Sequence, residues 1–209
     1  LAALLNIDAR KRVVCVGNGT AALHALLYMF QRKVKGPLKW LSPSFTFPTP
    51  CVGGFDCVFE NVCVETGTLL EETSLNGVDG VIVTNLFGSP VSLEYWVDRC
   101  DREGKLCILD NASSPLSTYR GMNIMNFGNA SFGSLHHTKF LGVGEGGFVV
   151  VDAADYDELN KICCFGFDDD RNYDSLSSNF KMSEFAAAFI LSHIKNYDMD
   201  RPAVLQRAF

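Results

Sequence analysis

The sequence has little positive charge. Its 209 residues include 18 lysines and arginines against 24 acidic residues, so the net charge is −6 at pH 7. A chain with this charge lacks the basic stripe with which proteins bind nucleic acids or anionic membrane surfaces. It also lacks an apolar run long enough to span a bilayer, since the longest candidate, residues 185–191, is better interpreted as part of a buried helix. We therefore expect neither nucleic-acid binding nor membrane insertion.

The eight cysteines form no C-x-x-C pair, which is the spacing of many redox and zinc sites. Several of them lie inside apolar runs, as reduced core thiols do, and this predicts a cytoplasmic location and no metal site. The even spacing of Cys51, Cys57 and Cys63 leaves a metal site as a minor alternative, which the lack of a nearby histidine weakens.

Short apolar runs alternate with segments of helical spacing along the chain. This alternation predicts an α/β fold with a largely parallel sheet, because crossover helices join parallel strands. We find no internal repeat, low-complexity tract or linker. The predicted strands are residues 13–16, 38–41, 56–60, 80–84, 106–109 and 148–151, and the predicted helices are residues 21–31, 92–103 with Ser92 as N-cap, and 182–196.

Lys139 is the most informative residue of the sequence. It lies between Ser134 and a glycine-rich turn, and an apolar strand follows. Lysine is the side chain that forms a Schiff base with an aldehyde cofactor, because a neutral amine condenses with a carbonyl and burial lowers the lysine pKa. Asp110 follows the apolar run 106–109 and suits the pyridinium partner that pyridoxal 5'-phosphate enzymes need. Taken alone, a lysine is usually a solvated surface charge.

The turn at residues 17–22 fits the dinucleotide fingerprint G-x-G-x-x-A between a strand and a helix. That fingerprint expects an acidic residue about twenty positions later, but no Asp or Glu occurs between Asp8 and Asp56. Free backbone N–H groups and the positive end of a helix would still attract a phosphate. The alternative is a plain strand-to-helix turn capped by Thr20.

A second glycine motif, residues 142–147, precedes a strand rather than a helix, so we interpret it as a turn that lets the backbone pass close to Lys139. Phe47 follows a predicted strand and could stack on a planar cofactor, although phenylalanine is more often a core residue. For His136 and His137 a packing or hydrogen-bonding role is the default. Glu145 could act in proton transfer or be simply solvated.

Taken in order, six segments of this chain resemble the DegT/DnrJ/EryC1/StrS family of aminotransferases, which work on nucleotide-linked sugars. No single segment is decisive, but all six occur in family order and with family-like spacing. The segments are residues 18–23, 43–47, 110–113 continuing to 119–121, 134–139, 145–147 and 179–184.

The resemblance implies the large domain of a fold type I transferase that depends on pyridoxal phosphate, with a mostly parallel central sheet flanked by helices. Lys139 would form the Schiff base with the cofactor and later carry the proton between cofactor and substrate. Asp110 would pair with the protonated ring nitrogen, and Phe47 would stack on the ring. Gly19 and Thr20, with the Ser134 hydroxyl, would hold the cofactor phosphate.

Asn179 falls where the family sends an asparagine to the cofactor phosphate of the other subunit, which implies a homodimer with composite active sites.

Three positions of this sequence depart from the family pattern. Ser113 replaces a usual glutamine or histidine beside the cofactor, so this contact is either lost or bridged by water. Leu116 replaces a glycine and Lys181 replaces an arginine.

The resemblance also implies a domain division. We expect residues 1–197 to form the cofactor-binding large domain, with its leading segment missing, and residues 198–209 to begin the connection to an absent C-terminal small domain.

The sequence therefore predicts an aminotransferase that takes the amino group of an amino acid donor, such as glutamate, and gives it to a keto-sugar on a nucleotide. Three alternatives stay open. A sugar dehydratase of the same family would have histidine in place of the lysine, which Lys139 opposes. A catalytically inactive, dimeric cofactor-binding domain would explain Ser113, Leu116 and the missing small domain. A nicotinamide-dependent oxidoreductase is weakened by the absent acidic residue.

Overall fold

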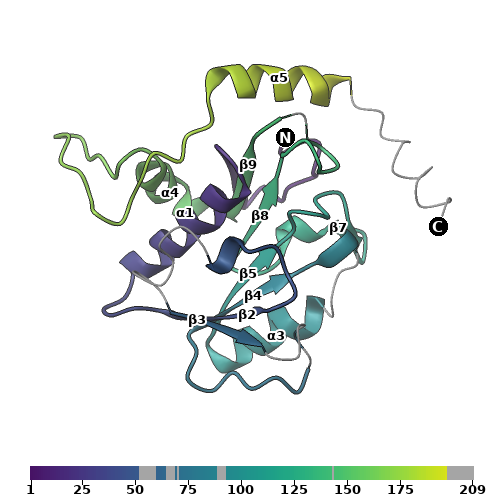
Figure 1. Ribbon diagram of the computed structural model, residues 1–209, viewed down its shortest axis with the longest axis vertical. Coiled ribbons are helices and arrows are strands. Elements are labelled where there is room, and N and C mark those ends of the chain that lie inside the picture. The colour runs from purple at the N-terminus through teal and green to yellow at the C-terminus, as the bar shows by residue number, and fades with distance from the viewer. Residues whose placement is uncertain (52–59, 65–68, 70, 89–92, 143, 197–209) are drawn as a thin grey trace.

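In the part of the chain that the structure describes, seven strands form the central sheet. The computed structural model describes residues 1–51, 60–64, 69, 71–88, 93–142 and 144–196 (Figure 1). The strand order is β1-β9-β8-β5-β4-β2-β3. All pairs from β8 to β3 are parallel, and β9 runs antiparallel to both of its neighbours, β1 and β8. The strands are β1 (Lys11–Val16), β2 (Lys39–Pro43), β3 (Glu60–Val64), β4 (Gly80–Thr84), β5 (Leu106–Asp110), β8 (Ala130–Ser134) and β9 (Gly147–Asp152).

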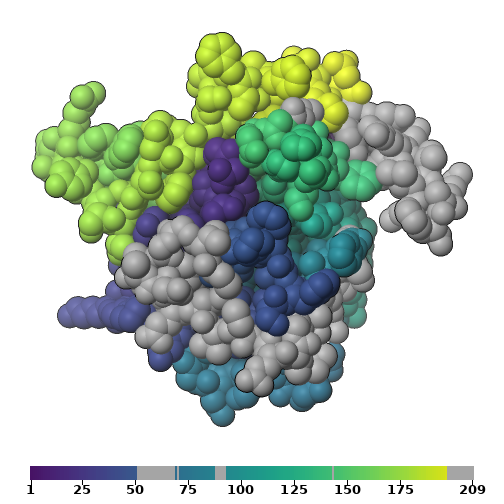
Figure 2. Space-filling model, in the orientation of Figure 1, coloured from purple at the N-terminus to yellow at the C-terminus, as the bar shows by residue number. Residues whose placement is uncertain are grey.

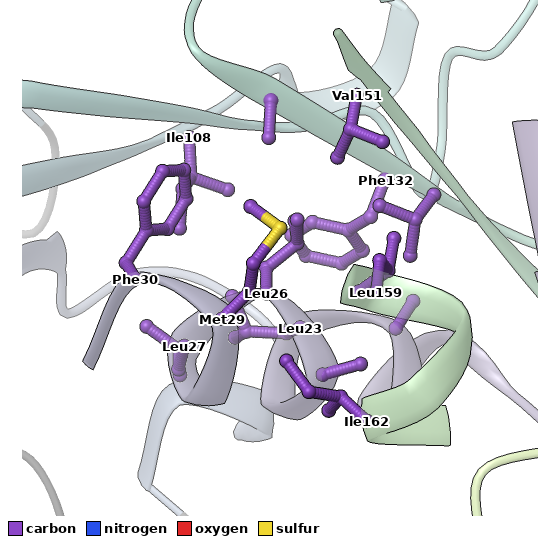
Figure 3. Close-up of a cluster of buried hydrophobic side chains, with 14 of the residues drawn as sticks. Leu23, Leu26, Leu27, Met29, Phe30, Ile108, Phe132, Val151, Leu159 and Ile162 are labelled. Atoms are coloured by element: carbon purple, nitrogen blue, oxygen red, sulfur yellow. The ribbon is translucent and has the colours of Figure 1, made fainter. Parts of the chain in front are cut away.

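Helices cover both faces of this sheet. On one face lie α1 (Gly19–Arg32) and α4 (Tyr156–Cys163), and on the other lies α3 (Leu93–Glu103), as Figure 1 shows. Figure 3 shows how side chains of α1 and α4 fill the space beneath the strands. Each fully buried apolar side chain in such a layer contributes roughly 1.5–3 kcal/mol. The predicted α/β fold with a mostly parallel sheet is therefore confirmed.

Helix α5 (Glu184–Lys195) lies outside these two layers. The Ser183 side chain accepts a hydrogen bond from the Ala186 N–H and so caps its N-terminus. Its inner side packs through Ile190 against a third apolar cluster, which also contains Leu5 and Phe148. A small hairpin of β6 (Thr118–Tyr119) and β7 (Met122–Asn123) lies outside the main sheet, and short 3-10 turns occur at Thr49–Cys51, Leu86–Gly88, Ile124–Asn126 and Ala153–Asp155. No helix in the described ranges has both the length and the apolar character that a membrane crossing requires.

Strand β8, helix α4 and the hairpin were not predicted from the sequence. Strand β8 reads Ala-Ser-Phe-Gly-Ser and is buried along its whole length, but its small and hydroxylated residues give no apolar run. Its burial comes from its place between β5 and β9, which local sequence does not reveal. The predicted strand 56–60 lies outside the described residues except for Glu60, where β3 begins, and the predicted N-cap Ser92 also lies outside them.

Candidate active site

A pocket of about 510 Å³ lies where the C-terminal ends of the parallel strands meet the turn after β1. Open α/β sheets place ligands at this edge. In Figure 2 the turn after β1 (purple), the loop after β2 (blue) and the loop after β8 (green) come together on the visible face. Every predicted site residue except Asn179 lines the pocket, namely Gly19, Thr20, Phe47, Asp110, Ser113, Ser134 and Lys139.

One end of the pocket is built by the N-terminus of α1. The Asn18 side chain accepts a hydrogen bond from the Ala21 N–H at 2.8 Å and caps the helix, so Asn18 rather than the predicted Thr20 is the capping residue. The first turn of α1 carries no acidic residue, and its positive end faces the pocket through Gly19 and Thr20. Gly19 packs closely on Ser134, since a Cβ at position 19 would lie 3.2 Å from the Ser134 Cβ. This end is therefore a polar cradle suited to an anion.

The glycine-rich turn after Lys139 allows two close backbone approaches. A Cβ on Gly142 would lie 1.7 Å from the His136 carbonyl oxygen and 3.0 Å from that of Lys139. A Cβ on Gly147 would lie 2.3 Å from the Asn18 carbonyl oxygen. These positions therefore require glycine, and the interpretation of this motif as a turn that brings the backbone close to Lys139 is confirmed.

Asp110 forms the buried acidic end of the site. It ends β5, is 6% exposed, and its Oδ1 accepts a hydrogen bond from the Ala112 N–H at 3.0 Å. Burial raises the pKa of Asp110 from 3.8 to about 6, although the Ala112 hydrogen bond and the charge of Lys139 act in the opposite direction. A cationic ligand group would favour the ionised form of this carboxyl.

Lys139 brings an amine into the same pocket. It lies on the loop that follows β8, and its side chain is half-buried. Its Nζ donates a hydrogen bond to the Ser113 Oγ at 3.4 Å. The predicted pair of an amine and a buried carboxyl, Lys139 and Asp110, therefore lines one cavity.

Hydroxyl and aromatic side chains complete the pocket. Phe47 lines the pocket and is 69% exposed, so it is not a core residue. Thr46 pairs with Thr84 through their hydroxyl oxygens at 3.4 Å, and Thr20 pairs with Thr49 at the same distance. Thr84 lies opposite Asp110 in the register of β4 and β5.

The histidines of the loop behave differently from each other. The His136 side chain lines the pocket, whereas His137 is not among the lining residues. The Thr138 hydroxyl oxygen lies 2.8 Å from the His136 Nδ1 and the Thr138 backbone nitrogen lies 3.3 Å from it, so Nδ1 rather than Nε2 is the ring atom that contacts Thr138. That Nε2 lies 3.5 Å from a carboxylate oxygen of Glu145, which also lines the pocket. The hydrogen-bonding role expected for His136 is confirmed.

Thr46, Thr49 and Thr84 were not predicted as pocket residues, and a buried contact between the amides of Asn85 and Asn111 was not predicted either. The Asn85 side-chain N–H donates to the Asn111 Oδ1, and the Asn85 backbone N–H donates to the Asp110 carbonyl at 2.9 Å. A usable signal was present, because Thr84 ends a predicted strand and Asn85 follows it, at the sheet edge where ligands bind.

Asn179 lies away from the pocket and is exposed. It forms an antiparallel bridge with Cys164, and the neighbouring Phe180 carbonyl accepts a hydrogen bond from the Gly17 N–H at 2.8 Å. Ser183 caps α5, so Asn179 is not the N-cap of this helix. Its reach into a partner subunit stays a prediction.

The other two departures from the family pattern lie outside the pocket lining. Leu116 packs against the third apolar cluster. The Lys181 Nζ lies 3.6 Å from the Cys164 Sγ and 4.7 Å from the centre of the Phe165 ring.

Comparison with known proteins gives a consistent set of relatives. The family model described as the DegT/DnrJ/EryC1/StrS aminotransferase family matches residues 3–201. Protein Rv3402c of Mycobacterium tuberculosis is 28% identical over 200 residues, which cover 89% of this chain and 48% of that protein. GDP-perosamine synthase of Escherichia coli O157:H7 is 26% identical over 194 residues, covering 88% of this chain and 53% of the synthase.

Among solved structures, DesI, crystallised in the presence of its TDP-sugar product, is 26% identical with a TM-score of 0.79. The match covers 93% of this chain and 50% of DesI. The chain spans about half the length of the curated relatives it matches.

Proposed function

Because this chain belongs to the DegT/DnrJ/EryC1/StrS aminotransferase family, we propose that it forms the cofactor-binding part of a pyridoxal phosphate-dependent aminotransferase. The proposed reaction moves an amino group from an amino acid donor to a keto-sugar linked to a nucleotide. One observation carries the proposal: Lys139, the buried Asp110 and the α1 N-terminus all line a single cavity. An aldehyde, a ring nitrogen and a phosphate are the three groups that these features would bind.

The residues of the pocket fit pyridoxal phosphate. The pocket has a volume of about 510 Å³, which lies within the usual range for small-ligand sites. The cradle of Gly19, Thr20 and Ser134 offers helix-end polarity and hydroxyl groups to a phosphate. The pKa of Asp110 is raised because burial outweighs the opposing charge of Lys139, and a protonated ring nitrogen would add a further cationic partner for this carboxyl.

Each pocket residue then has a definite task. When bound, pyridoxal phosphate supplies the electron sink that amino-group transfer requires. Lys139 would hold the cofactor through its amine and would then carry a proton at Nζ. Asp110 would keep a proton on the ring nitrogen, and the exposed ring of Phe47 would stack on the cofactor and exclude water.

The sugar substrate is inferred from relatives. GDP-perosamine synthase and DesI, whose structure contains its TDP-sugar product, carry nucleotide-linked sugars in their names or titles. We propose the same substrate class for this chain, and a cytoplasmic location in keeping with its free cysteines at positions 15, 100, 107, 163 and 164.

The alternatives are supported less well. Lys139 lies in the pocket and opposes the dehydratase. The oxidoreductase would need a carboxylate at the end of the strand that follows α1, but β2 ends in Ser42 and Pro43. A catalytically inactive cofactor-binding domain would differ from the proposed enzyme only in lacking amino-group transfer, so an experiment is needed to separate the two.

An absorbance titration with pyridoxal phosphate tests this function. We expect a band of a protonated Schiff base, and borohydride treatment should fix the cofactor to Lys139, as peptide mass spectrometry would show. Adding amino acid donors one at a time should then shift the band as the amino group moves to the cofactor. A band that no donor shifts would favour the inactive domain, and no band at all would reject the proposal.

We also propose a homodimer that shares its active sites. Helix α5 is apolar on both sides, with Ile190 packed inward and Phe185 and Phe189 exposed by 89% and 65%. A helix that is apolar all round is normally covered. The exposed Asn179 lies on the segment that leads to this helix. A two-fold pairing would let each subunit give Asn179 to the phosphate site of the other.

Light scattering and the variant Asn179→Ala test the shared site. We expect a dimer at micromolar protein, with an interface above about 2,000 Å² in total. Asn179→Ala should weaken cofactor binding about tenfold, the effect of one lost hydrogen bond to a charged group, and leave the dimer intact. Asn76→Ala, an exposed asparagine outside the pocket lining, serves as the matched control. A monomer, or a dimer whose cofactor affinity ignores Asn179→Ala, would contradict the shared site.

A further inference from the structure

The amine of Lys139 has a defined partner inside the pocket. Its Nζ donates to the Ser113 Oγ at 3.4 Å, and the two residues come from different loops. Ser113 follows β5 and Lys139 follows β8, which are neighbouring strands of the sheet. A lysine side chain has many rotamers, and holding it in one of them costs conformational entropy. A hydrogen-bond partner at a fixed place therefore favours one rotamer of Lys139 and so one position of its amine.

Asp110 does not hold the Lys139 amine in position. Its carboxylate accepts the hydrogen bond of the Ala112 N–H, and no ion pair found among the described residues joins it to Lys139. The charge of Lys139 lowers the pKa of Asp110, but burial outweighs this effect and the pKa stays near 6. The charge of Lys139 therefore affects the pKa of Asp110, but Asp110 does not fix the position of the Lys139 Nζ.

We propose that Ser113 is a positioning residue for Lys139 and sets the rate at which the amine captures an aldehyde cofactor. The inference rests on the proposed function and concerns the position at which this chain departs from the family pattern. The Ser113 oxygen accepts a hydrogen bond from the ammonium or from the neutral amine. The neutral amine is thus held through an N–H, and its lone pair stays available.

The capture step balances without any further reactant. A C=N bond forms between Nζ of Lys139 and the aldehyde carbon. The C=O bond breaks, and its oxygen leaves as water with the two hydrogens that the neutral amine gives up. No oxidant or reductant takes part. Ser113 contributes only by keeping Nζ in the pocket, so it is expected to affect the rate of capture.

Rapid mixing with pyridoxal phosphate, followed by absorbance across neutral and alkaline pH, tests this role. We expect Ser113→Ala to capture the cofactor about fivefold more slowly, which corresponds to the roughly 1 kcal/mol that one hydrogen bond contributes. Ser113→Gly, a second variant without the hydroxyl, should be slowed to a similar extent. Ser113→Thr, which keeps the hydroxyl, should stay within about twofold of the original chain. Ser175→Ala is the same change outside the pocket lining and should leave the rate unchanged.

The outcomes separate this inference from the proposed function. Equal rates of capture for the original chain and Ser113→Ala would overturn the positioning role while leaving the cofactor assignment in place. A Ser113→Thr variant as slow as Ser113→Ala would also overturn it, because the loss would then follow from packing rather than from the hydroxyl. If the original chain captures no cofactor, the proposed function fails and the role of Ser113 fails with it.

Discussion

Replacing Lys139 with alanine is expected to abolish covalent attachment of pyridoxal phosphate, because among the residues that line the pocket it is the single lysine. The fold should persist. The side chain is half-buried and its described hydrogen bond, to Ser113, is long, so we expect the free energy of unfolding to change by no more than about 1 kcal/mol. Borohydride reduction followed by mass spectrometry measures the attachment.

Two further variants make this test specific. Lys139→Arg keeps a positive charge near Asp110, but a guanidinium stays protonated and cannot condense with an aldehyde. It should therefore lose attachment as completely as Lys139→Ala. Lys35→Ala removes an exposed lysine outside the pocket lining and should attach the cofactor normally. A trapped adduct that survives in Lys139→Ala would assign the chemistry to another lysine.

Replacing Asp110 with asparagine is expected to weaken cofactor binding by about 10- to 100-fold. A neutral amide cannot stabilise the charge of a protonated ring, and a charge-assisted hydrogen bond contributes about 1.5–3 kcal/mol. The absorbance of the bound cofactor should change as well. Equilibrium titration and the spectrum measure both effects, and an unchanged affinity and spectrum would place Asp110 outside the cofactor contacts.

The same substitution should stabilise the cofactor-free protein at neutral pH. The pKa of Asp110 is raised from 3.8 to about 6 in the folded state, so this group favours folding below pH 3.8 and loses that contribution as the pH rises through 6. At pH 7 the buried carboxylate then costs roughly 2–3 kcal/mol, at about 1.4 kcal/mol for each pKa unit. Asparagine does not ionise and avoids this cost.

Denaturant unfolding at several pH values between 4 and 7 measures this difference. The stability of Asp110→Asn relative to the original chain should increase as the pH rises through about 6. Other carboxyl groups, such as Asp8 with its pKa lowered to about 2, lose their contribution as the pH falls, but they act in both proteins and cancel in the difference. A difference that is independent of pH would contradict the burial of an ionisable Asp110.

Sequence reasoning predicted the pocket best where chemistry leaves a local signature. Lys139, Asp110 and the turn at Gly19 were found because a lysine before a glycine turn, an acid ending a strand and a strand-to-helix turn are all visible in short windows. The threonine pairs and the Asn85–Asn111 contact were not found, since each joins residues from separate loops or strands. Only the order of the strands in the sheet brings such partners together.

The same reason explains the misjudged fold elements. Gly80–Thr84 was predicted with its observed bounds, because its apolar run is complete in itself. Strand β8 was missed because its five residues are buried by neighbours distant in the chain rather than by their own hydrophobicity. The replacement of Thr20 by Asn18 as the helix cap is a shift of two residues that only the side-chain contact reveals.

The place of β1 in the sheet has a consequence for the order of folding. Among the described strands, β1 pairs with β9, and Lys11 lies opposite Asp152. Helix α1, which follows β1, packs against β8, β9 and α4. During synthesis, the part of α1 that packs against β8, β9 and α4 therefore stays uncovered until the chain has passed residue 163. Contacts of such sequence separation form slowly, and exposed apolar helices invite aggregation. The cradle at Gly19 should thus be among the last parts of the protein to form.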